Sequence, residues 1–310
     1  MSPQKIIVGY DGSQSAQVAL QWAGAVADRR QVPLLVICAT GGEGSGLGLR
    51  RERVLRMREG KARTIAKEAM DLFEGRIGVP VSAETAVGDP GEVLSSLSTE
   101  ARLVVVGHRG HGSMRGILIG SVAFAVMNHS TSPVAVVRES VGSLPSSEYP
   151  IVAGVDGSSG SYRGLNYAAD LAADTGASLR IAVAWRGAAP ELSDTVYEVD
   201  EEGHPLPGER DPWQQTDRSS LLDDLSQEIS HAAKHTASLA VKHVKQLHPG
   251  LRLETYVEEG RSEDVILAAA PGAALIVVGA RGHSVFTSLL IGSTSRSVVQ
   301  SAPCAVIVVR

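Results

Sequence analysis

Two glycine-rich segments have the spacing of a loop that binds phosphate. The first reads Gly107-x2-Gly110-x9-Gly120-Ser121, and the pattern returns as Gly279-x2-Gly282-x9-Gly292-Ser293. Each segment follows an apolar run and ends where a helix is predicted to begin. Glycine lets backbone N–H groups approach a ligand closely, and a helix N-terminus adds partial positive charge. A flexible surface loop is the alternative, but the flanking elements and the second copy favour phosphate binding.

Charged side chains accompany both segments. Arg109 and Arg281 hold equivalent positions in the two loops, where a guanidinium could donate hydrogen bonds to phosphate or pair with a partner subunit. Asp11 and Asp156 each follow the first predicted strand of a copy, within the sequence Asp-Gly-Ser. A carboxylate at the carboxyl end of such a strand could bind a sugar hydroxyl or a divalent cation. The same tripeptide favours an Asx turn or a helix N-cap, so both roles stay open.

The chain contains a tandem duplication. Eight of the fifteen residues that start at Gly107 are identical to those that start at Gly279, at an offset of 172. Near the start of each copy, residues 8–13 match residues 153–158 at an offset of 145. The offsets differ because the second copy carries an insertion, rich in proline and acidic residues, near 187–216. We therefore predict one domain over 1–141 and another over 149–310, joined by a turn-rich linker.

Strand and helix signals alternate within each copy. In the first copy, apolar runs at 5–8, 33–38 and 103–107 are typical of buried strands, and residues 79–87 alternate as a strand does. Helices are predicted after Ser13 or Ser15, over about 49–73, from Pro90 onward, and over about 120–130. A last apolar strand is predicted at 134–138, and the second copy repeats this order. The pattern predicts an α/β fold with two tandem, doubly wound, mostly parallel five-stranded sheets of Rossmann-like type.

Composition excludes several classes of protein. With 310 residues, 43% hydrophobic content and a formal net charge of −5, the chain is neither disordered nor basic enough to bind nucleic acid. No stretch reaches the ~18 apolar residues of a membrane span, and no signal peptide is visible at the N-terminus. Cys38 and Cys304 lie in apolar runs and are predicted to be core residues of a reducing compartment. We therefore expect a cytoplasmic protein that inserts into no membrane.

The glycine pattern after a buried strand, with an aspartate at the end of the first strand, resembles the universal stress protein family. The resemblance covers both copies and is to tandem, two-domain members of the kind found in actinobacteria. It implies the fold of that family and two bound ATP molecules per chain, with Mg²⁺ near Asp11 and Asp156. In the first copy it implies nucleotide contacts from Gly9, Asp11, Cys38, Gly107, His108, Arg109, Gly110, Gly120, Ser121 and Val122. In the second copy the matching residues are Gly154, Asp156, Val183, Gly279, Ala280, Arg281, Gly282, Gly292, Ser293 and Thr294.

The resemblance also assigns roles. Cys38 is implied to meet the adenine, while Asp11 lies on the ribose and metal side and the loop residues surround the phosphates. Because glycine permits close backbone approach, Gly107→Ala or Gly120→Ala is expected to weaken only the first site. The double variant Asp11→Glu plus Gly107→Ala is expected to lose nucleotide while keeping its fold. The family implies a nucleotide-dependent regulator of stress response or growth arrest, acting on an unknown protein client.

Turnover of the nucleotide is a separate question. The sequence contains neither the Gly-Lys-Ser/Thr of a Walker A loop nor the G-x-S-x-G of a hydrolase elbow. His108 and His111, and the pair His231 and His235, lack the further ligands of a zinc motif. Phosphoryl transfer needs a positioned base or water-orienting group, and each predicted site offers one aspartate and one arginine. The sequence therefore favours a binding module over an enzyme; the alternatives are a slow ATPase or phosphotransfer enzyme and an interaction module with a vestigial site.

The last strand of each copy is predicted to join the two copies. Residues 134–137 and 306–309 are apolar, and an exposed apolar sheet edge needs to be covered. The family resemblance implies that these strands pair antiparallel about a pseudo-twofold axis. A homodimer of whole chains stays open, with the acidic insertion as a candidate contact or lid.

Overall fold

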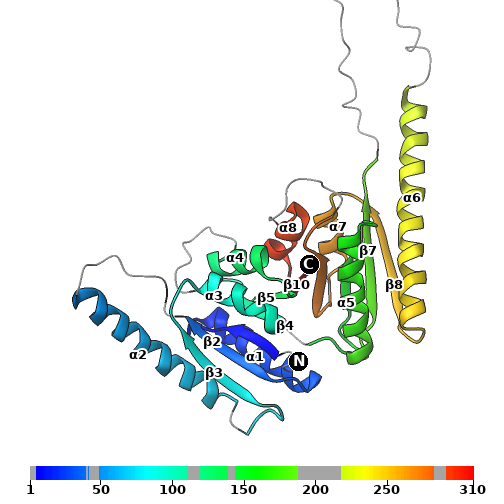
Figure 1. Ribbon diagram of the computed structural model, residues 1–310. Coiled ribbons are helices and arrows are strands. Elements are labelled where there is room, and N and C mark those ends of the chain that lie inside the picture. Colours follow the sequence, from blue (N-terminus) through cyan, green and yellow to red (C-terminus); the bar gives the residue numbers. More distant parts are fainter. Residues whose placement is uncertain are drawn as a thin grey trace, which may run out of the picture.

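Residues 5–39, 41, 49–73, 75–110, 119–138, 144–187, 218–282 and 291–310 are described by the computed structural model. The insertion, as residues 188–216, and the centres of both glycine loops, with His111 and His283, lie outside the described residues. Figure 1 shows strands and helices that alternate along the rest of the chain.

Both halves follow the same order of elements. The first half consists of β1 (Lys5–Gly9), α1 (Gln14–Arg30), β2 (Leu34–Ala39), α2 (Leu49–Asp71), β3 (Val81–Ala86), α3 (Pro90–Leu97), a 3₁₀ turn (Ser98–Glu100), β4 (Ala101–Gly107), α4 (Ser121–His129) and β5 (Val134–Val137). The second half consists of β6 (Ile151–Gly154), α5 (Ser159–Thr175), β7 (Leu179–Trp185), α6 (Arg218–Leu247), β8 (Leu253–Glu259), α7 (Ser262–Ala268), β9 (Leu275–Gly279), α8 (Ser293–Ser301) and β10 (Ala305–Val309). The predicted order of strands and helices is confirmed.

The strands form one continuous sheet of ten. Their order is β3-β2-β1-β4-β5-β10-β9-β6-β7-β8, so the second half mirrors the first about the β5–β10 pair. Within each half all pairs are parallel, whereas β5 and β10 pair antiparallel, with Val136 opposite Val306 and Val134 opposite Val308. The predicted pairing of the last strands is confirmed. It removes two apolar edges at once and merges the two predicted five-stranded sheets into one.

The helix that follows the first strand begins at the same cap in both halves. The Ser13 hydroxyl accepts a hydrogen bond from the Ala16 N–H at 3.2 Å, and the Ser158 hydroxyl accepts one from the Ser161 N–H at 3.1 Å. A serine at this position satisfies one of the N–H groups that a helix start leaves without a partner. Of the two predicted caps of α1, Ser13 is therefore the one used.

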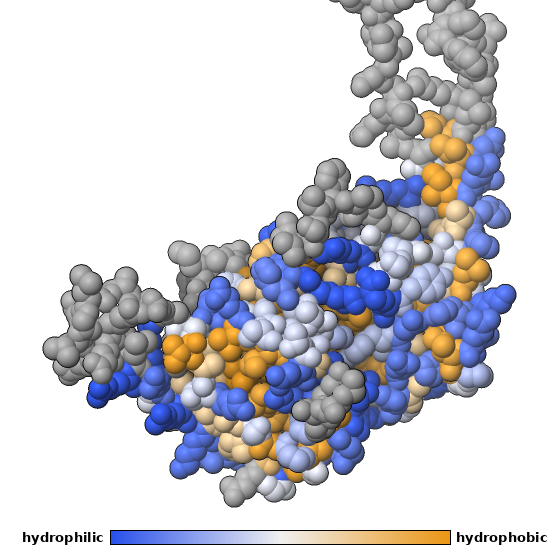
Figure 2. Space-filling model, in the orientation of Figure 1, coloured by the Kyte–Doolittle hydropathy of each residue, from blue (hydrophilic) through white to orange (hydrophobic). Residues whose placement is uncertain are grey.

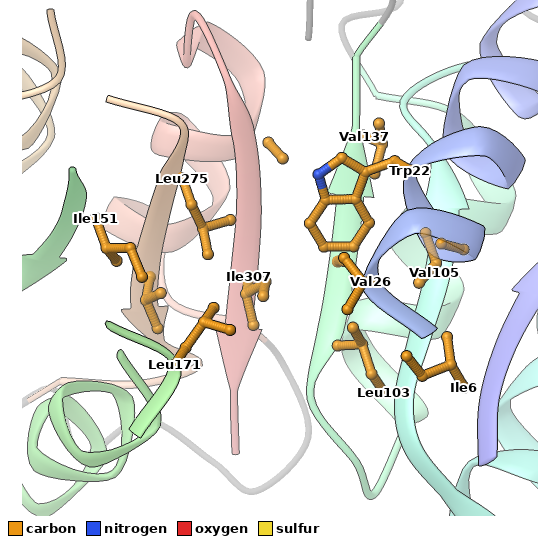
Figure 3. Close-up of a cluster of buried hydrophobic side chains, with 14 of the residues drawn as sticks. Ile6, Trp22, Val26, Leu103, Val105, Val137, Ile151, Leu171, Leu275 and Ile307 are labelled. Atoms are coloured by element: carbon orange, nitrogen blue, oxygen red, sulfur yellow. The ribbon is translucent and has the colours of Figure 1, made fainter. Parts of the chain in front are cut away.

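Helices cover both faces of the sheet and bury a core on each. On one face, α1, α2, α5 and α6 pack on strand residues such as Ile6, Val8 and Ile181. On the other, α3, α4, α7 and α8 pack on residues such as Ile7, Val104 and Val278. Figure 3 shows the first core where the halves meet: side chains of the first half, such as Ile6 and Val105, lie on one side of the β5–β10 pair, and those of the second half, such as Ile151 and Leu275, lie on the other. Cys38 and Cys304 are free and buried, as the sequence predicts.

One helix of the second half reaches beyond the sheet. In Figure 1, α6 extends past the end of β8, and Figure 2 shows apolar surface on this part of the molecule. Leu225, which is 45% exposed, belongs to the first half of α6. Within the described ranges, no helix combines the length and apolar content that crossing a bilayer requires.

A difference in capping between the halves can be measured. The Asp89 side chain accepts hydrogen bonds from the N–H groups of Gly91 at 2.8 Å and Glu92 at 3.2 Å, at the start of α3. The equivalent residue before α7 is Arg261, which makes no such cap. We expect Asp89→Ala to lower the free energy of unfolding by about 1 kcal/mol. Arg261→Ala serves as the matched control in urea denaturation, and equal losses in the two variants would contradict the assignment.

Candidate functional site

The Asp-Gly-Ser segments form the same tight turn in both halves. The Ser13 N–H donates to Asp11 Oδ1 at 2.9 Å, and the Ser158 N–H donates to Asp156 Oδ1 at 2.9 Å. The glycine between them has a φ of +81° at position 12 and +87° at position 157, a backbone conformation that glycine adopts without strain. The structural role that the sequence left open is therefore real, and it fixes both carboxylates at the carboxyl edge of the sheet.

The two ends of each glycine loop are brought together by backbone hydrogen bonds. The His108 N–H donates to the Val137 carbonyl at 2.8 Å, and the Gly120 N–H donates to the His108 carbonyl at 2.9 Å. In the second half, Ala280 is bonded to Val309 at 2.7 Å and to Gly292 at 2.8 Å in the same way. The chain therefore leaves the sheet after β4 or β9 and returns to the same edge, where α4 or α8 begins.

The helices that begin there have no side-chain cap. Gly120 and Gly292 are the N-cap residues of α4 and α8, and neither has a side chain that could satisfy the first N–H groups. The start of a helix carries partial positive charge, and its N–H groups bind phosphate or carboxylate oxygens. Arg109 and Arg281 line the same two cavities as these helix starts.

A cavity lies at this edge in each half. The cavity of the first half has a volume of about 360 Å³ and that of the second half about 280 Å³. Cavities of this size accommodate small organic ligands. Sixteen of the predicted site residues line the two cavities: Gly9, Asp11, Gly107, Arg109, Gly110, Gly120, Ser121 and Val122, and Gly154, Asp156, Gly279, Arg281, Gly282, Gly292, Ser293 and Thr294.

Cys38 and Val183 do not line the cavities, which corrects the adenine contact expected from the sequence. Both side chains belong to the core on the α1 and α5 face, because successive side chains of a strand point to opposite faces. Their neighbours line the cavities instead: Ile37 and Ala39 in the first half, Ala182 and Ala184 in the second. Because each cavity lies on the α4 or α8 face, the alternation of side chains along the strand could have identified these neighbours from the sequence.

His108 and Ala280 are also absent from the residues that line the cavities. The His108 side chain is 4% exposed and lies close to the Val299 backbone of the second half, and within the described ranges its Nε2 is buried without a hydrogen-bond partner. Burial, with the nearby charges of Arg138 and Arg109, lowers the pKa of His108 from 6.5 to about 4. Its ring is therefore neutral at pH 7 and contributes no positive charge to a phosphate site.

Residues that the sequence interpretation missed come from α3 and α7. Pro90 and Leu94 line the first cavity, and Ser262 and Ile266 line the second. The missing Cβ of Gly9 would lie 2.7 Å from Leu94, so glycine allows α3 to approach the sheet at this point. Apolar residues at helical spacing predict that one side of a helix is buried. They do not show which of these residues line a cavity.

The two cavities differ in chemistry. The first is lined by Tyr10, Ile37 and Leu94, whereas the second is lined by more hydroxyl groups, among them Ser262, Thr294 and Ser295. Each has one carboxylate among its lining residues, Asp11 or Asp156. Among the described residues, no group of three or more His, Cys, Asp or Glu side chains could hold a metal ion. A cation bound by Asp11 or Asp156 would therefore need ligands beyond the described side chains.

Comparison with known proteins gives a consistent result. The family described as "Universal stress protein family" matches residues 3–138 and 149–310. A universal stress protein of Mycolicibacterium smegmatis is 28% identical over 314 residues, which cover 98% of this chain and 96% of the relative. One from Mycobacterium tuberculosis strain H37Rv is 30% identical over 312 residues, covering 98% and 96%. The crystal structure of a universal stress protein from Archaeoglobus fulgidus aligns with 100% of this chain and 99% of its own, with a TM-score of 0.67 and 21% identity.

Proposed function

The chain belongs to the universal stress protein family, and we propose that it binds two ATP molecules, one in each cavity, as a nucleotide-dependent regulator of stress response or growth arrest. One observation carries the proposal. In both halves, an uncapped helix N-terminus, an arginine and a carboxylate meet around a cavity of suitable volume at the carboxyl edge of the sheet. Such an edge is where open α/β sheets bind ligands.

The groups around each cavity divide into those for phosphate and those for the rest of the nucleotide. In the first half, the N–H groups of Ser121 and Val122, in the first turn of α4, and the guanidinium of Arg109 suit the phosphates. Asp11 suits a ribose hydroxyl, and the apolar surface of Ile37 and Ala39 suits the base. Asp11 and Asp156 would each contribute a carboxylate to a Mg²⁺ ion carried by the phosphates, since Mg²⁺ commonly combines one or two carboxylates with substrate phosphates.

Calorimetric titration with ATP tests the proposal directly. We expect two equivalents of ATP for the wild type. Ala39→Phe and Ala184→Phe place a ring in the first and second cavity respectively, so each variant is expected to bind one equivalent and the double variant none. Circular dichroism checks that the variants remain folded. A wild type that binds no ATP, or a folded double variant that still binds two equivalents, would overturn the proposal.

The proposal includes slow or absent turnover. The described residues that line each cavity include one carboxylate, and one of its oxygens already accepts the N–H of Ser13 or Ser158. This leaves little provision for a general base, which phosphoryl transfer to water or a substrate requires. Single-turnover hydrolysis of bound ATP measures the rate. A value in the range of about 1–100 s⁻¹, which is typical of kinases, would instead assign an enzyme.

The regulatory part of the proposal predicts a change of state on binding. Both helices that begin at a cavity, α4 and α8, lead into the two strands that join the halves. Nucleotide is therefore expected to alter protease sensitivity or the association of whole chains with each other or with a client. Sedimentation velocity and limited proteolysis, with ATP and without, compare the wild type with the empty double variant. Identical behaviour in all four samples would rule out regulation by nucleotide.

A further inference from the structure

The two halves hold each other's helix ends. The Arg138 guanidinium, at the end of β5, donates to the Gln300 and Ala302 carbonyls at 2.9 Å each, at the end of α8. Arg310, at the end of β10, donates to the Met127 carbonyl at 3.0 Å and to the Asn128 carbonyl, at the end of α4. A guanidinium at a helix C-terminus satisfies the last carbonyls and complements the helix dipole. The repeat relates these two contacts, so an arginine of each half caps the C-terminus of a helix in the other half.

A third contact between the halves reaches the second cavity. Asn128 lies in the last turn of α4 and is 1% exposed. Its Oδ1 accepts the Ile291 N–H at 2.8 Å, while its Nδ2 donates to the Phe124 carbonyl at 2.8 Å. Ile291 directly precedes Gly292, the N-cap of α8. A side chain of the first half therefore holds the turn at which the second cavity's phosphate-binding helix begins.

This contact has no counterpart in the opposite direction. The repeat places Gln300 where α4 has Asn128, and Ile119 where the second half has Ile291. Gln300 is partly exposed, and across the described ranges no hydrogen bond joins its side chain to the Ile119 N–H. His108 likewise contacts the Val299 backbone of α8, whereas its counterpart Ala280 has no polar side-chain group. The second cavity is thus supported by the first half more than the reverse.

We propose that Asn128 is a positioning residue of the second nucleotide site and that α4 couples the two sites. The inference rests on the proposed nucleotide binding. The first turn of α4, at Ser121 and Val122, lines the first cavity, and its last turn carries Asn128. Ser121 and Asn128 are seven positions apart on this helix, about 10 Å along its axis. Phosphate that orders the start of α4 also orders Asn128, and through it the Ile291–Gly292 turn.

The test reads each site alone in the full-length chain, with Mg·ATP as the probe. Ala39→Phe blocks the first site and leaves the second to be titrated. In this background, Asn128→Leu is expected to weaken ATP binding about tenfold, because the buried Ile291 N–H loses its acceptor. In Asn128→Asp, burial favours the neutral acid, whose carbonyl oxygen can accept the Ile291 N–H while its O–H donates to the Phe124 carbonyl in place of the amide. This variant is expected to restore binding to within about twofold of the Ala39→Phe parent. Rescue by the acceptor distinguishes positioning from a general packing defect.

The matched control uses the other half. In the Ala184→Phe background, which leaves only the first site, Gln300→Leu is expected to leave ATP affinity unchanged. Coupling is measured as a change in the ATP affinity of the second site. This affinity is compared between chains whose first site is filled with ATP and chains whose first site is blocked by Ala39→Phe. We expect filling to raise its affinity by about fivefold, and Asn128→Leu to abolish that gain. Three results would overturn the inference. Asn128→Leu could weaken both sites equally, Asn128→Asp could fail to restore binding, or the affinity of the second site could be the same whether the first site is filled or blocked.

A further measurement needs no change at Asn128. In the Ala184→Phe chain, ATP can fill only the first site, and hydrogen exchange then reports on the Ile291 amide. We expect exchange at Ile291 to slow when ATP is added, because the acceptor on α4 becomes better ordered. Unchanged exchange while ATP binds would overturn the coupling alone. A wild type that binds no ATP would overturn the proposed function, so the two failures are distinguishable.

Discussion

Replacing Gly279 with alanine is expected to lower the free energy of unfolding by about 3 kcal/mol, the upper range for forcing a group into a packed core. A Cβ at this position would lie 2.5 Å from the Gly160 carbonyl oxygen and 2.6 Å from its carbon. Both are backbone atoms in the first turn of α5, so neither can rotate away. The helix or the end of β9 must therefore shift as a whole, which urea denaturation detects.

The control is Gly250→Ala, where a Cβ would have no atom within 4 Å. We expect that variant to unfold within about 0.5 kcal/mol of the wild type. Coincident unfolding curves for Gly279→Ala and the wild type would show that the contact between α5 and β9 can open at no cost. The clash also changes how nucleotide binding by such variants is interpreted, because a loss of binding could follow from a displaced helix.

The same geometry corrects the expectation for Gly107. Its missing Cβ would lie 2.9 Å from the backbone carbon and oxygen of Ser15, at the start of α1. Gly107→Ala is therefore not a change confined to phosphate binding, although Gly107 does line the first cavity. At Gly120 the closest atom would be the His108 oxygen at 3.3 Å, which demands a smaller adjustment. Ala39→Phe and Ala184→Phe are the better probes of the two sites for this reason.

Acidification from pH 7 to pH 4 is expected to cost the fold about 3 kcal/mol through His108 alone. Its pKa is about 4 in the folded protein, against 6.5 for an unperturbed histidine. Between these values the unfolded chain binds a proton that the folded chain does not. The free energy of unfolding therefore falls as the pH drops below about 6.5, and the loss levels off once the pH is below the folded pKa of about 4.

His108→Ala isolates this contribution, because the second half carries alanine at the equivalent position 280. The variant loses packing at every pH, so the measured quantity is the difference between the unfolding free energies at pH 7 and pH 4.5. We expect this difference to be smaller in the variant than in the wild type by about 2 kcal/mol. Equal differences would mean that the ring is solvated in the folded protein or reaches a compensating acceptor on protonation.

Local features of the chain were predictable because they depend on neighbours in sequence. The buried strands, the Asp-Gly-Ser turn and the return of the glycine loop at Gly120 each follow from a few consecutive residues and their backbone preferences. The duplication strengthened every one of these predictions, since each pattern occurs twice. For the same reason the sequence pointed to residues at strand ends and helix starts, such as Asp11, Gly110 and Ser121, which line the first cavity; their contact with nucleotide stays a prediction.

The face of a strand on which a side chain lies was harder to predict. Residues 33–38 are apolar without interruption, so hydrophobicity does not distinguish the side toward α1 from the side toward α4. A difference of one residue separates Cys38, in the core, from Ala39, in the cavity. Only the position of the covering helices distinguishes them, and that is a property of the whole sheet.

By itself, the sequence determined the duplicated α/β architecture and the two loops at the carboxyl edge, since these follow from local periodicity and glycine spacing. The tertiary structure alone decided that His108 faces the other half instead of the cavity, and that Asn128 reaches Ile291. Each of these contacts joins a residue of the first half to a residue of the second half that lies more than 160 positions away in the sequence. They arise from how two halves of similar sequence pack, and small differences such as asparagine for glutamine then make the two sites unequal.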